Sequence, residues 1–229
     1  MLRQEILDII EKSKTYGWVL EPDAKRILAL SGISVPRFAL AKSCADAVGF
    51  AGEHGFPLAA KVVSPAIMHK SDAKGVVVGI ETEDALCAVF DGFSRMEGFV
   101  GMHLEEMVSG MELIVGAKVD KQFGPVILFG MGGTGVELYR DTAIRMAPLE
   151  KSDVISMIKS IKAHPLLEGY RGEKPVAMED LTKTLIAFSE LVMDIHPMIE
   201  SIDLNPLFCS PERCVVGDAR IVLKMTEGI

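Results

Sequence analysis

The sequence predicts an α+β protein in which two lobes clasp a ligand cleft. Three observations support this fold class. Helix-period and strand-like segments alternate in the first part of the chain. A run of short strands separated by glycines follows, which is typical of an antiparallel sheet. Further helices and strands then complete the second lobe, so that no single class of element dominates.

The first part of the chain begins with two helices. Ile6, Ile9 and Ile10 share one helical face, and a second helix begins near Glu21 and ends at Gly32. Ser43 and Thr82 are N-cap residues of two later helices. The strand candidates of this part are Val35–Leu40, Leu58–Val63 and Val76–Ile80. The stretch SPAIMHKSDAKG lies between the last two of them and is expected to be a loop.

The second part begins with the glycine-separated strands. These strands are predicted at Val100–Glu106, Leu113–Lys118, Val126–Phe129 and Val136–Tyr139. A helix is expected from Ser152 and a longer one over Met178–Ile195. The final strand candidates are Ile199–Leu204, which Pro206 should end, Val215–Asp218 and Ala219–Leu223.

Composition excludes several classes of protein. The 229 residues carry a formal net charge of -8, which argues against a general nucleic-acid binder because such a protein needs a basic face. No apolar run reaches the roughly 20 residues of a membrane span. The N-terminus lacks the pattern of a signal peptide, so we expect a cytoplasmic protein. The four cysteines form no C-x-x-C pair, so neither a zinc site nor a disulfide framework is expected, and Cys44 and Cys87 are expected to be ordinary core thiols.

Two features suggest a site for phosphate. The stretch FGMGGTG has glycines at positions 130, 132, 133 and 135, which allow a backbone to approach phosphate closely. It is neither a P-loop nor a dinucleotide fingerprint, and a tight turn between strands explains it as well. Lys61 lies inside the apolar strand LAAKVVS, where a lysine needs a negative partner such as a nucleotide phosphate. Alternatively, its ammonium extends to solvent at the strand end.

Carboxylates gather where two of the predicted strands meet. Glu105 and Glu106 end one strand and Glu112 begins the next, so a chain reversal near Ser109–Gly110 would place them on one wall. Such a wall could hold the ribose hydroxyls and the exocyclic amine of adenine, with backbone contacts from Met107 and Val108. A solvated acidic hairpin is the alternative.

The segment ESIDLNPL suggests a metal site. Asp203 and Asn205 are two residues apart on a strand and therefore point to the same face. Asp218 lies on the following strand candidate. Oxygen ligands from a strand pair, completed by phosphate oxygens and water, suit Mg²⁺. An Asp–Asn pair that caps a turn is the alternative.

His69 is the pivotal candidate. It lies in the loop between two strands, beside Lys70 and Asp72. A neutral imidazole accepts a phosphoryl group on one nitrogen while the other nitrogen keeps its proton and is oriented by a carboxylate. Asp203 or Asp72 could be that carboxylate. A surface histidine without a catalytic role is the alternative.

Together these segments resemble one family. LAAKVVSPAIMHKSDAKGVVV, GMELIVGAKVDKQFGPVILFGMGGTGVELYRD, IRMAPL, HPLLEGYRG and IDLNPL are spaced as in the β subunit of ADP-forming acetate–CoA ligase, of the succinyl-CoA synthetase superfamily. The resemblance covers about residues 21–223. It implies an ATP-grasp fold, with subdomain A at about 35–106, subdomain B at about 107–229, and residues 1–34 packed on the outside.

The resemblance also implies roles for individual residues. Lys61 matches the lysine that binds nucleotide phosphates, and Gly75 is a further phosphate-binding candidate. Glu105 and Glu112 match the acidic residues near adenine and ribose. Asn205 and Asp218 match the magnesium ligands. His69 matches a second histidine of this family, and Asp203 matches the acidic residue that supports its phosphorylated form. Lys74 departs from the family, which usually shows a second glycine there.

The reaction implied is acyl-CoA + ADP + phosphate ⇌ acid + CoA + ATP. A CoA-binding α subunit forms an acyl phosphate, one of its histidines takes the phosphoryl group, and the β subunit passes that group to ADP with Mg²⁺. The implied assembly is an α2β2 heterotetramer. A non-catalytic nucleotide-binding subunit, or the same chemistry on another acyl or aryl acid, are the alternatives.

Overall fold

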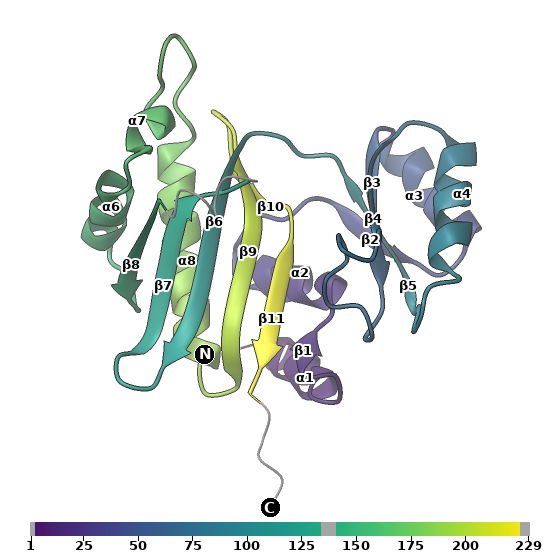
Figure 1. The fold of residues 1–229 in the computed structure, drawn as a ribbon, viewed down its shortest axis with the longest axis horizontal. Helices are drawn as coiled ribbons and strands as arrows, with labels where there is room; N and C mark the ends of the chain where they lie inside the picture. Colours follow the sequence, from purple (N-terminus) through teal and green to yellow (C-terminus); the bar gives the residue numbers. More distant parts are fainter. Residues whose placement is uncertain (1–2, 134–140, 225–229) are drawn as a thin grey trace, which may run out of the picture. The chain divides into compact units, whose positions relative to one another are not determined.

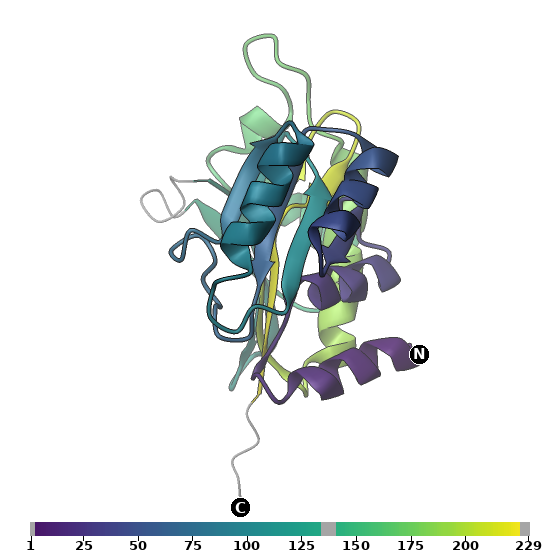
Figure 2. The ribbon, with the colours of Figure 1, turned by 90° about the vertical axis from the view of Figure 1, so that its right-hand side faces the viewer.

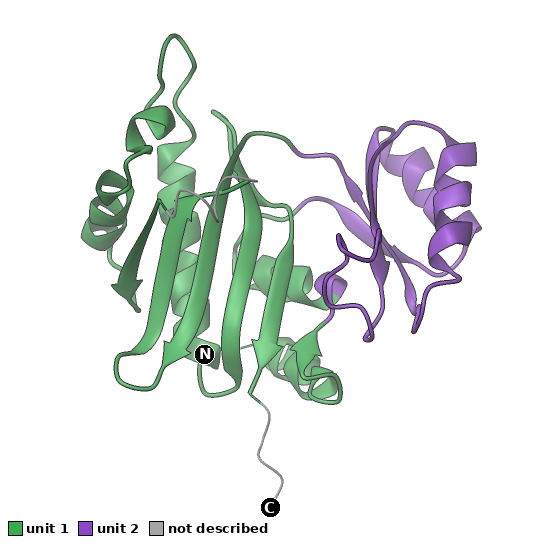
Figure 3. Ribbon diagram, viewed as in Figure 1, with its two compact units in different colours: residues 1–19, 23–35, 109–229 green, residues 20–22, 36–108 purple. Residues whose placement is uncertain are grey.

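The computed structural model describes residues 3–133 and 141–224, which form two compact units (Figure 3). Unit 1 comprises residues 1–19, 23–35 and 109–229, and unit 2 comprises residues 20–22 and 36–108. Each unit has its own antiparallel sheet and its own hydrophobic core. The predicted α+β class is therefore confirmed. No helix within the described part of the chain is long and apolar enough to cross a membrane.

Unit 2 is built on a four-stranded sheet in the order β2-β5-β3-β4. Its strands are β2 (Phe38–Ala41), β3 (Leu58–Val63), β4 (Val76–Ile80) and β5 (Gly101–Glu106). All six residues of β3 are buried, because β3 is an inner strand. A strand that is enclosed on both sides reads as a continuous apolar run, which is why its bounds are predicted correctly.

Two helices, α3 (Cys44–His54) and α4 (Glu83–Phe93), cover one face of this sheet (Figure 2). The Ser43 side chain accepts a hydrogen bond from the Asp46 N–H, and the Asp46 carboxylate accepts one from the Ser43 N–H in return. The Thr82 hydroxyl accepts from the Ala85 N–H. Both predicted N-caps are confirmed. They satisfy backbone donors that the first turn of a helix leaves unpaired.

Unit 1 is built on a seven-stranded sheet in the order β1-β11-β9-β6-β7-β8, with β10 paired to β9 (Figure 1). Its strands are β1 (Trp18–Val19), β6 (Met111–Asp120), β7 (Gly124–Met131), β8 (Thr142–Met146), β9 (Ile199–Cys209), β10 (Cys214–Val216) and β11 (Ala219–Leu223). The longest strand, β9, lies between β11 and β6. Residues of β9 therefore have ordered neighbours on both sides.

The helices of unit 1 are α1 (Gln4–Ser13), α2 (Glu21–Leu30), α6 (Lys151–Ser160), α7 (His164–Leu167) and α8 (Met178–Ile195). Helices α2 and α8 lie behind the sheet in Figure 1. The N-terminal segment does more than pack on the outside of this unit. Ile10 and Ile27 belong to its core, and β1 pairs with β11.

Some predicted elements are wrong. Pro206 does not end β9, which continues to Cys209, because the Pro206 carbonyl still accepts a hydrogen bond from the Gly217 N–H at 2.8 Å. The structure adds the short strands β1 and β8, which were not predicted. The candidate strand at Val136–Tyr139 lies outside the described residues.

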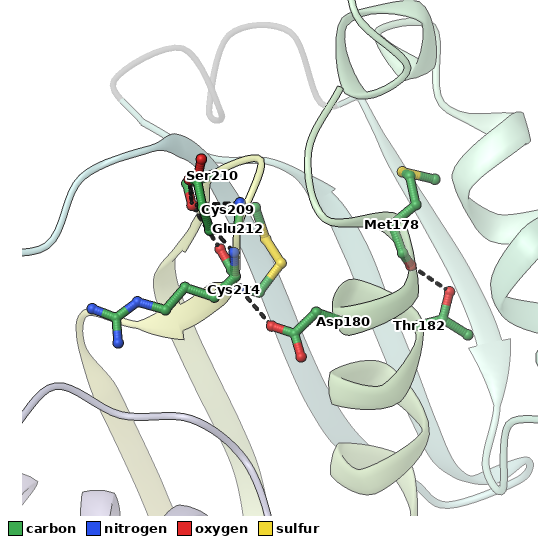
Figure 4. The surroundings of a disulfide bond; sticks show 8 residues. Met178, Asp180, Thr182, Cys209, Ser210, Glu212 and Cys214 are labelled. Carbon is green, nitrogen blue, oxygen red and sulfur yellow. Dashed lines mark hydrogen bonds between the residues drawn. A yellow bond between two sulfur atoms is a disulfide. The ribbon is translucent and has the colours of Figure 1, made fainter. Parts of the chain in front are cut away.

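The expectation of ordinary core thiols is also wrong, because the four cysteines form two disulfides. Cys44 and Cys87 join α3 to α4 across 43 residues of sequence. Cys209 and Cys214 face each other across the β9–β10 hairpin, five residues apart (Figure 4). Asp180 on α8 accepts a hydrogen bond from the Cys214 N–H at 2.7 Å, which ties the start of α8 to this hairpin.

The Cys44–Cys87 disulfide should stabilise its unit more than the Cys209–Cys214 disulfide stabilises unit 1. A cross-link removes more entropy from the unfolded chain when it closes a longer loop, and the two separations predict a difference of about 2 kcal/mol. We expect the loss of unfolding free energy to differ by this amount between the variant with Cys44 and Cys87 replaced by serine and the variant with Cys209 and Cys214 replaced. Hydrogen exchange of the slowest amides of each unit measures the two losses. Equal losses in the two variants would contradict it.

Candidate functional site

A cluster of buried charges surrounds Lys61 in unit 2. The Lys61 side chain comes from the inner strand β3 and is 9% exposed. Its Nζ lies 2.7 Å from Glu21 Oε1 and 2.9 Å from Glu105 Oε1. Both carboxylates are almost wholly buried. Since an ammonium inside a core is tolerated only when negative partners surround it, these two residues explain why β3 can contain a lysine.

Two further residues complete this charge cluster, which we define as Glu21, Lys61, Lys70, His103 and Glu105. The Lys70 ammonium pairs with the second oxygen of Glu21. His103 Nε2 lies 2.9 Å from Glu105 Oε2. Two lysines therefore balance two carboxylates. Glu21, His103 and Glu105 have the spacing of metal ligands, but the Lys61 ammonium contacts both carboxylates, so the chain itself supplies the positive charge.

The alternative in which the Lys61 side chain extends to solvent is wrong, because its ammonium is held between Glu21 and Glu105. The sequence predicts Glu21 only as the start of a helix. Nothing in the sequence indicates that Lys61, 40 residues away, is its partner. Glu21 is thus a residue of the site that sequence reasoning missed. The nucleotide-phosphate role of Lys61 stays a prediction.

Glu105 and Glu106, two carboxylates of the predicted wall, point to opposite faces of β5. Glu105 points into the charge cluster, whereas Glu106 on the opposite face of β5 pairs with Arg37, whose guanidinium NH2 lies 2.7 Å from Glu106 Oε2. Glu112 is exposed and lies on β6, which belongs to the other sheet. No hairpin joins β5 to β6. Successive residues of a strand face opposite ways, so Glu105 and Glu106 cannot share one wall. Met107 and Val108 follow β5 outside any regular element.

The loop over residues 64–75 carries His69, which is exposed. The loop is fixed at both ends. Ser64 Oγ donates to the Glu97 carbonyl at 2.6 Å and accepts from the Ala66 N–H. At the other end, the Gly75 N–H donates to the Lys70 carbonyl at 2.7 Å, and a Cβ on Gly75 would lie 2.4 Å from Val62 Cγ1. Gly75 is therefore required by packing as well as predicted to bind phosphate.

The glycine-rich stretch packs against β6 in unit 1. The Gly132 N–H donates to the Glu112 carbonyl at 2.8 Å, and a Cβ on Gly132 would come within 2.9 Å of the Glu112 backbone. A Cβ on Gly133 would lie 2.9 Å from Glu112 Oε2. The close approach of the two backbones explains Gly132, and a positive φ of 81° explains Gly133. Gly135 lies outside the described residues.

The predicted metal ligands of unit 1 lie at neighbouring positions of the sheet, Asn205 on β9 and Asp218 immediately before β11 rather than on the strand predicted for it. Leu204 on β9 is opposite Ala219 on β11, and the Gly217 N–H donates to the Pro206 carbonyl. Asn205 and Asp218 lie between these two contacts, and both are half-buried. A carboxylate and an amide oxygen brought together in this way form a donor set that suits Mg²⁺. The antiparallel register of β9 and β11 alone places Asn205 beside Asp218.

Asp203 lies two residues before Asn205 on the same strand and is opposite Arg220. Arg220 NH2 is 3.4 Å from Asp203 Oδ2. Burial raises the pKa of the Asp203 carboxyl, and the Arg220 charge opposes that shift only in part. Asp203 therefore holds a proton more readily than an ordinary surface aspartate does.

Lys25 is a second residue that sequence reasoning missed. It lies on α2, is wholly buried, and donates from Nζ to the Gly217 carbonyl at 3.0 Å. The turn before Asp218 is thus held from α2 through the Gly217 carbonyl and from β9 through the Gly217 N–H. In the sequence, Lys25 cannot be told from the other basic residue of this helix, which carries charges of both signs.

Replacing Lys25 with methionine should destabilise unit 1 by about 1–3 kcal/mol, because the buried Gly217 carbonyl loses its charged donor. Trp18, the only tryptophan, is buried in the neighbouring strand β1 and reports the unfolding of unit 1 by fluorescence. Arg26→Met is the matched control, since Arg26 is exposed on the same helix. Equal unfolding midpoints for the two variants would argue against this role.

Comparison with known proteins decides the family. A family model described as an ATP-grasp domain matches residues 11–223. The chain is 41% identical to the β subunit of acetate–CoA ligase [ADP-forming] I from Pyrococcus furiosus, over 94% of this chain and 97% of that subunit. The chain belongs to the family of ATP-grasp β subunits of ADP-forming acetate–CoA ligases. The predicted resemblance and the predicted ATP-grasp fold are confirmed.

Solved structures agree with this family. The ATP-grasp chain superimposes on a Pyrococcus horikoshii protein with a TM-score of 0.92 at 35% identity, covering 99% of this chain and 100% of the other. An acetyl-coenzyme A synthetase of Ca. Korarchaeum cryptofilum gives a TM-score of 0.84 at 38% identity, covering 96% and 100%. That structure contains coenzyme A and Mg-AMPPCP, with a phosphohistidine segment that points toward the nucleotide binding site.

Proposed function

We propose that this ATP-grasp chain binds Mg-ADP or Mg-ATP and transfers a phosphoryl group between a phosphohistidine and the nucleotide. The reaction is that of an ADP-forming acyl-CoA synthetase. The observation that carries this proposal is the 41% identity that spans almost the full length of both this chain and a β subunit of that enzyme class. The two units are proposed to act as the two subdomains of one ATP-grasp unit.

His69 is proposed to carry the phosphoryl group within this chain. In the direction that consumes ATP, an imidazole nitrogen attacks the γ-phosphorus, a P–N bond forms, the P–O bond to ADP breaks, and ADP leaves. The other ring nitrogen keeps its proton, and the resulting positive charge is stabilised by a carboxylate, for which Asp203 and Asp72 are the candidates. The exposure of His69 in a loop that is fixed at both ends supports this role.

Lys61 and the residues after β5 are proposed to hold the nucleotide. An ammonium has three donors, and phosphoryl transfer depends mainly on positioning and on neutralising charge. Lys61 would contact the phosphates, and Gly75 would offer its backbone nearby. Glu105, Glu106, Met107, Val108 and Glu112 are the proposed contacts of adenine and ribose. The separate directions of Glu105 and Glu106 mean that these two glutamates cannot act on one face of the ligand together.

Asn205 and Asp218 are proposed to hold Mg²⁺. When bound, the ion would neutralise phosphate charge on the nucleotide. We expect Asp218→Ala and Asn205→Ala each to weaken magnesium-dependent nucleotide binding by about tenfold or more, since each removes one of few protein ligands. Calorimetric titration with ADP at several Mg²⁺ concentrations measures this. Arg213→Ala, an exposed residue nearby in sequence, is the control, and unchanged affinity in both ligand variants would count against the site.

A CoA-binding α subunit is the proposed partner, in an α2β2 assembly. The acid and CoA would bind on that partner, so this chain alone should not release CoA from an acyl-CoA. A coupled assay that follows ATP formation from acyl-CoA, ADP and phosphate tests the whole proposal. ATP should form only when both subunits are present. If the assembled subunits bind nucleotide but form no ATP with any acyl-CoA, a non-catalytic nucleotide-binding role replaces the proposal.

A further inference from the structure

Between its two fixed ends, the loop that carries His69 is also attached to the core of unit 2 through Lys70. Lys70, the next residue after His69, directs its side chain inward, where only 10% of it is exposed. Its ammonium pairs with the Glu21 carboxylate, which is 2% exposed. The exposed His69 is therefore adjacent in sequence to a buried ion pair. A side chain that is held in this way restricts the backbone of its neighbour.

The Glu21 carboxylate pairs with a lysine of the strand and with a lysine of the loop. One oxygen accepts from Lys61 at 2.7 Å, and the other pairs with Lys70. Glu21 thus connects the lysine of strand β3 with the loop over residues 64–75. Because Lys61 is itself fixed by Glu105, the attachment point is rigid. Removing one partner of a buried ion pair costs more than removing one partner of a surface pair, because the remaining charge is left buried without compensation.

Backbone hydrogen bonds within the loop also involve Lys70 and its neighbour His69. The Lys70 carbonyl accepts the Gly75 N–H at 2.7 Å, and the His69 carbonyl accepts the Ala73 N–H at 3.4 Å. Lys74, by contrast, is exposed and adopts a positive φ of 55° at the tip of this turn. The loop therefore contains two lysines of opposite character, one buried against Glu21 and one directed to solvent.

We propose that Lys70 is a positioning residue that anchors the His69 loop to Glu21 and so sets the efficiency with which His69 is phosphorylated. The second half of this statement rests on the proposed function of His69. The first half concerns the chain without any ligand. Lys70 itself need not touch the reacting atoms. Its effect is transmitted through the backbone between residues 69 and 70.

The test uses Lys70→Met with Lys74→Met as the matched control. Lys70→Met should fold, because Glu21 keeps Lys61 as a partner. Amide exchange of Ala73 and Gly75 should become about tenfold faster in Lys70→Met and stay unchanged in Lys74→Met, because local opening is governed by local contacts. The slowest amides of β3 should be unaffected in both variants. Lys70→Arg, which keeps a cation for Glu21, should restore part of the protection.

The same variants are then phosphorylated with labelled ATP and Mg²⁺. Lys70→Met should label His69 about tenfold more slowly than Lys74→Met and the unaltered chain, because an imidazole that is no longer held in place reaches the attacking geometry less often. Equal loop exchange in the two methionine variants would overturn the anchor. Faster exchange with an unchanged labelling rate would overturn its role in positioning His69. If the unaltered chain is not labelled, the proposed function of His69 fails, while the exchange result still tests the anchor.

Discussion

Replacing Lys61 with methionine should lower the free energy of unfolding of unit 2 by about 3–5 kcal/mol. The variant would leave Glu21 and Glu105 buried with one lysine, Lys70, and with His103 as the remaining basic groups. Removing the counter-ion of a buried carboxylate destabilises the fold by more than the ion pair contributed, because nothing then offsets the cost of desolvating the carboxylate. The effect should be large even though the methionine side chain fills a similar volume.

Amide exchange of the slowest residues in β3 and β5 measures this loss directly in unit 2. Lys118→Met is the matched control, since Lys118 is an exposed strand lysine on β6. Adding Glu21→Gln to Lys61→Met should recover part of the stability, because one uncompensated charge disappears. A loss below about 1 kcal/mol, the range of a surface ion pair, would show that the charge cluster does not stabilise the unit.

The second large effect concerns His69. His69→Ala should abolish acid-labile phosphate on this chain when it is incubated with Mg-ATP, because no other side chain replaces the attacking nitrogen. Nucleotide affinity should stay close to that of the unaltered chain, since His69 is a transfer residue rather than a nucleotide ligand in this account. Calorimetry with ADP, together with labelling by γ-labelled ATP, separates binding from transfer.

His54→Ala is the control for that experiment. His54 belongs to the same unit, ends α3 and packs against Phe50, with ring centroids 4.4 Å apart. It should retain full labelling. If His69→Ala loses both labelling and nucleotide binding, the residue acts in binding, and the transfer role is wrong.

Elements with strong periodicity were predictable from the sequence. Leu58–Val63, Val76–Ile80 and Met178–Ile195 have the bounds that their patterns predict. The two-residue strand β1 and the five-residue β8 are too short for a pattern to emerge, because their pairing with β11 and β7 defines them. Likewise, Pro206 argues for a strand end locally, although its carbonyl still pairs with Gly217.

The candidate site was predictable only where residues act within one segment. The juxtaposition of Asn205 and Asp218 was predictable because the chain returns antiparallel to the strand that carries Asn205. The partners of Lys61 were not found, since Glu21 is 40 residues away and belongs to a helix. The Cys44–Cys87 disulfide escaped prediction for the same reason. Long-range pairing depends on tertiary packing, and one sequence does not reveal which distant charges or thiols meet.

The central claim is that His69 takes a phosphoryl group from the nucleotide. The most direct measurement is to incubate the purified chain with γ-labelled ATP and Mg²⁺, digest it under alkaline conditions, and locate the label by mass spectrometry. We expect acid-labile, alkali-stable phosphate on His69, within the peptide that covers residues 64–75. Label on another residue, or acid-stable label alone, would contradict it.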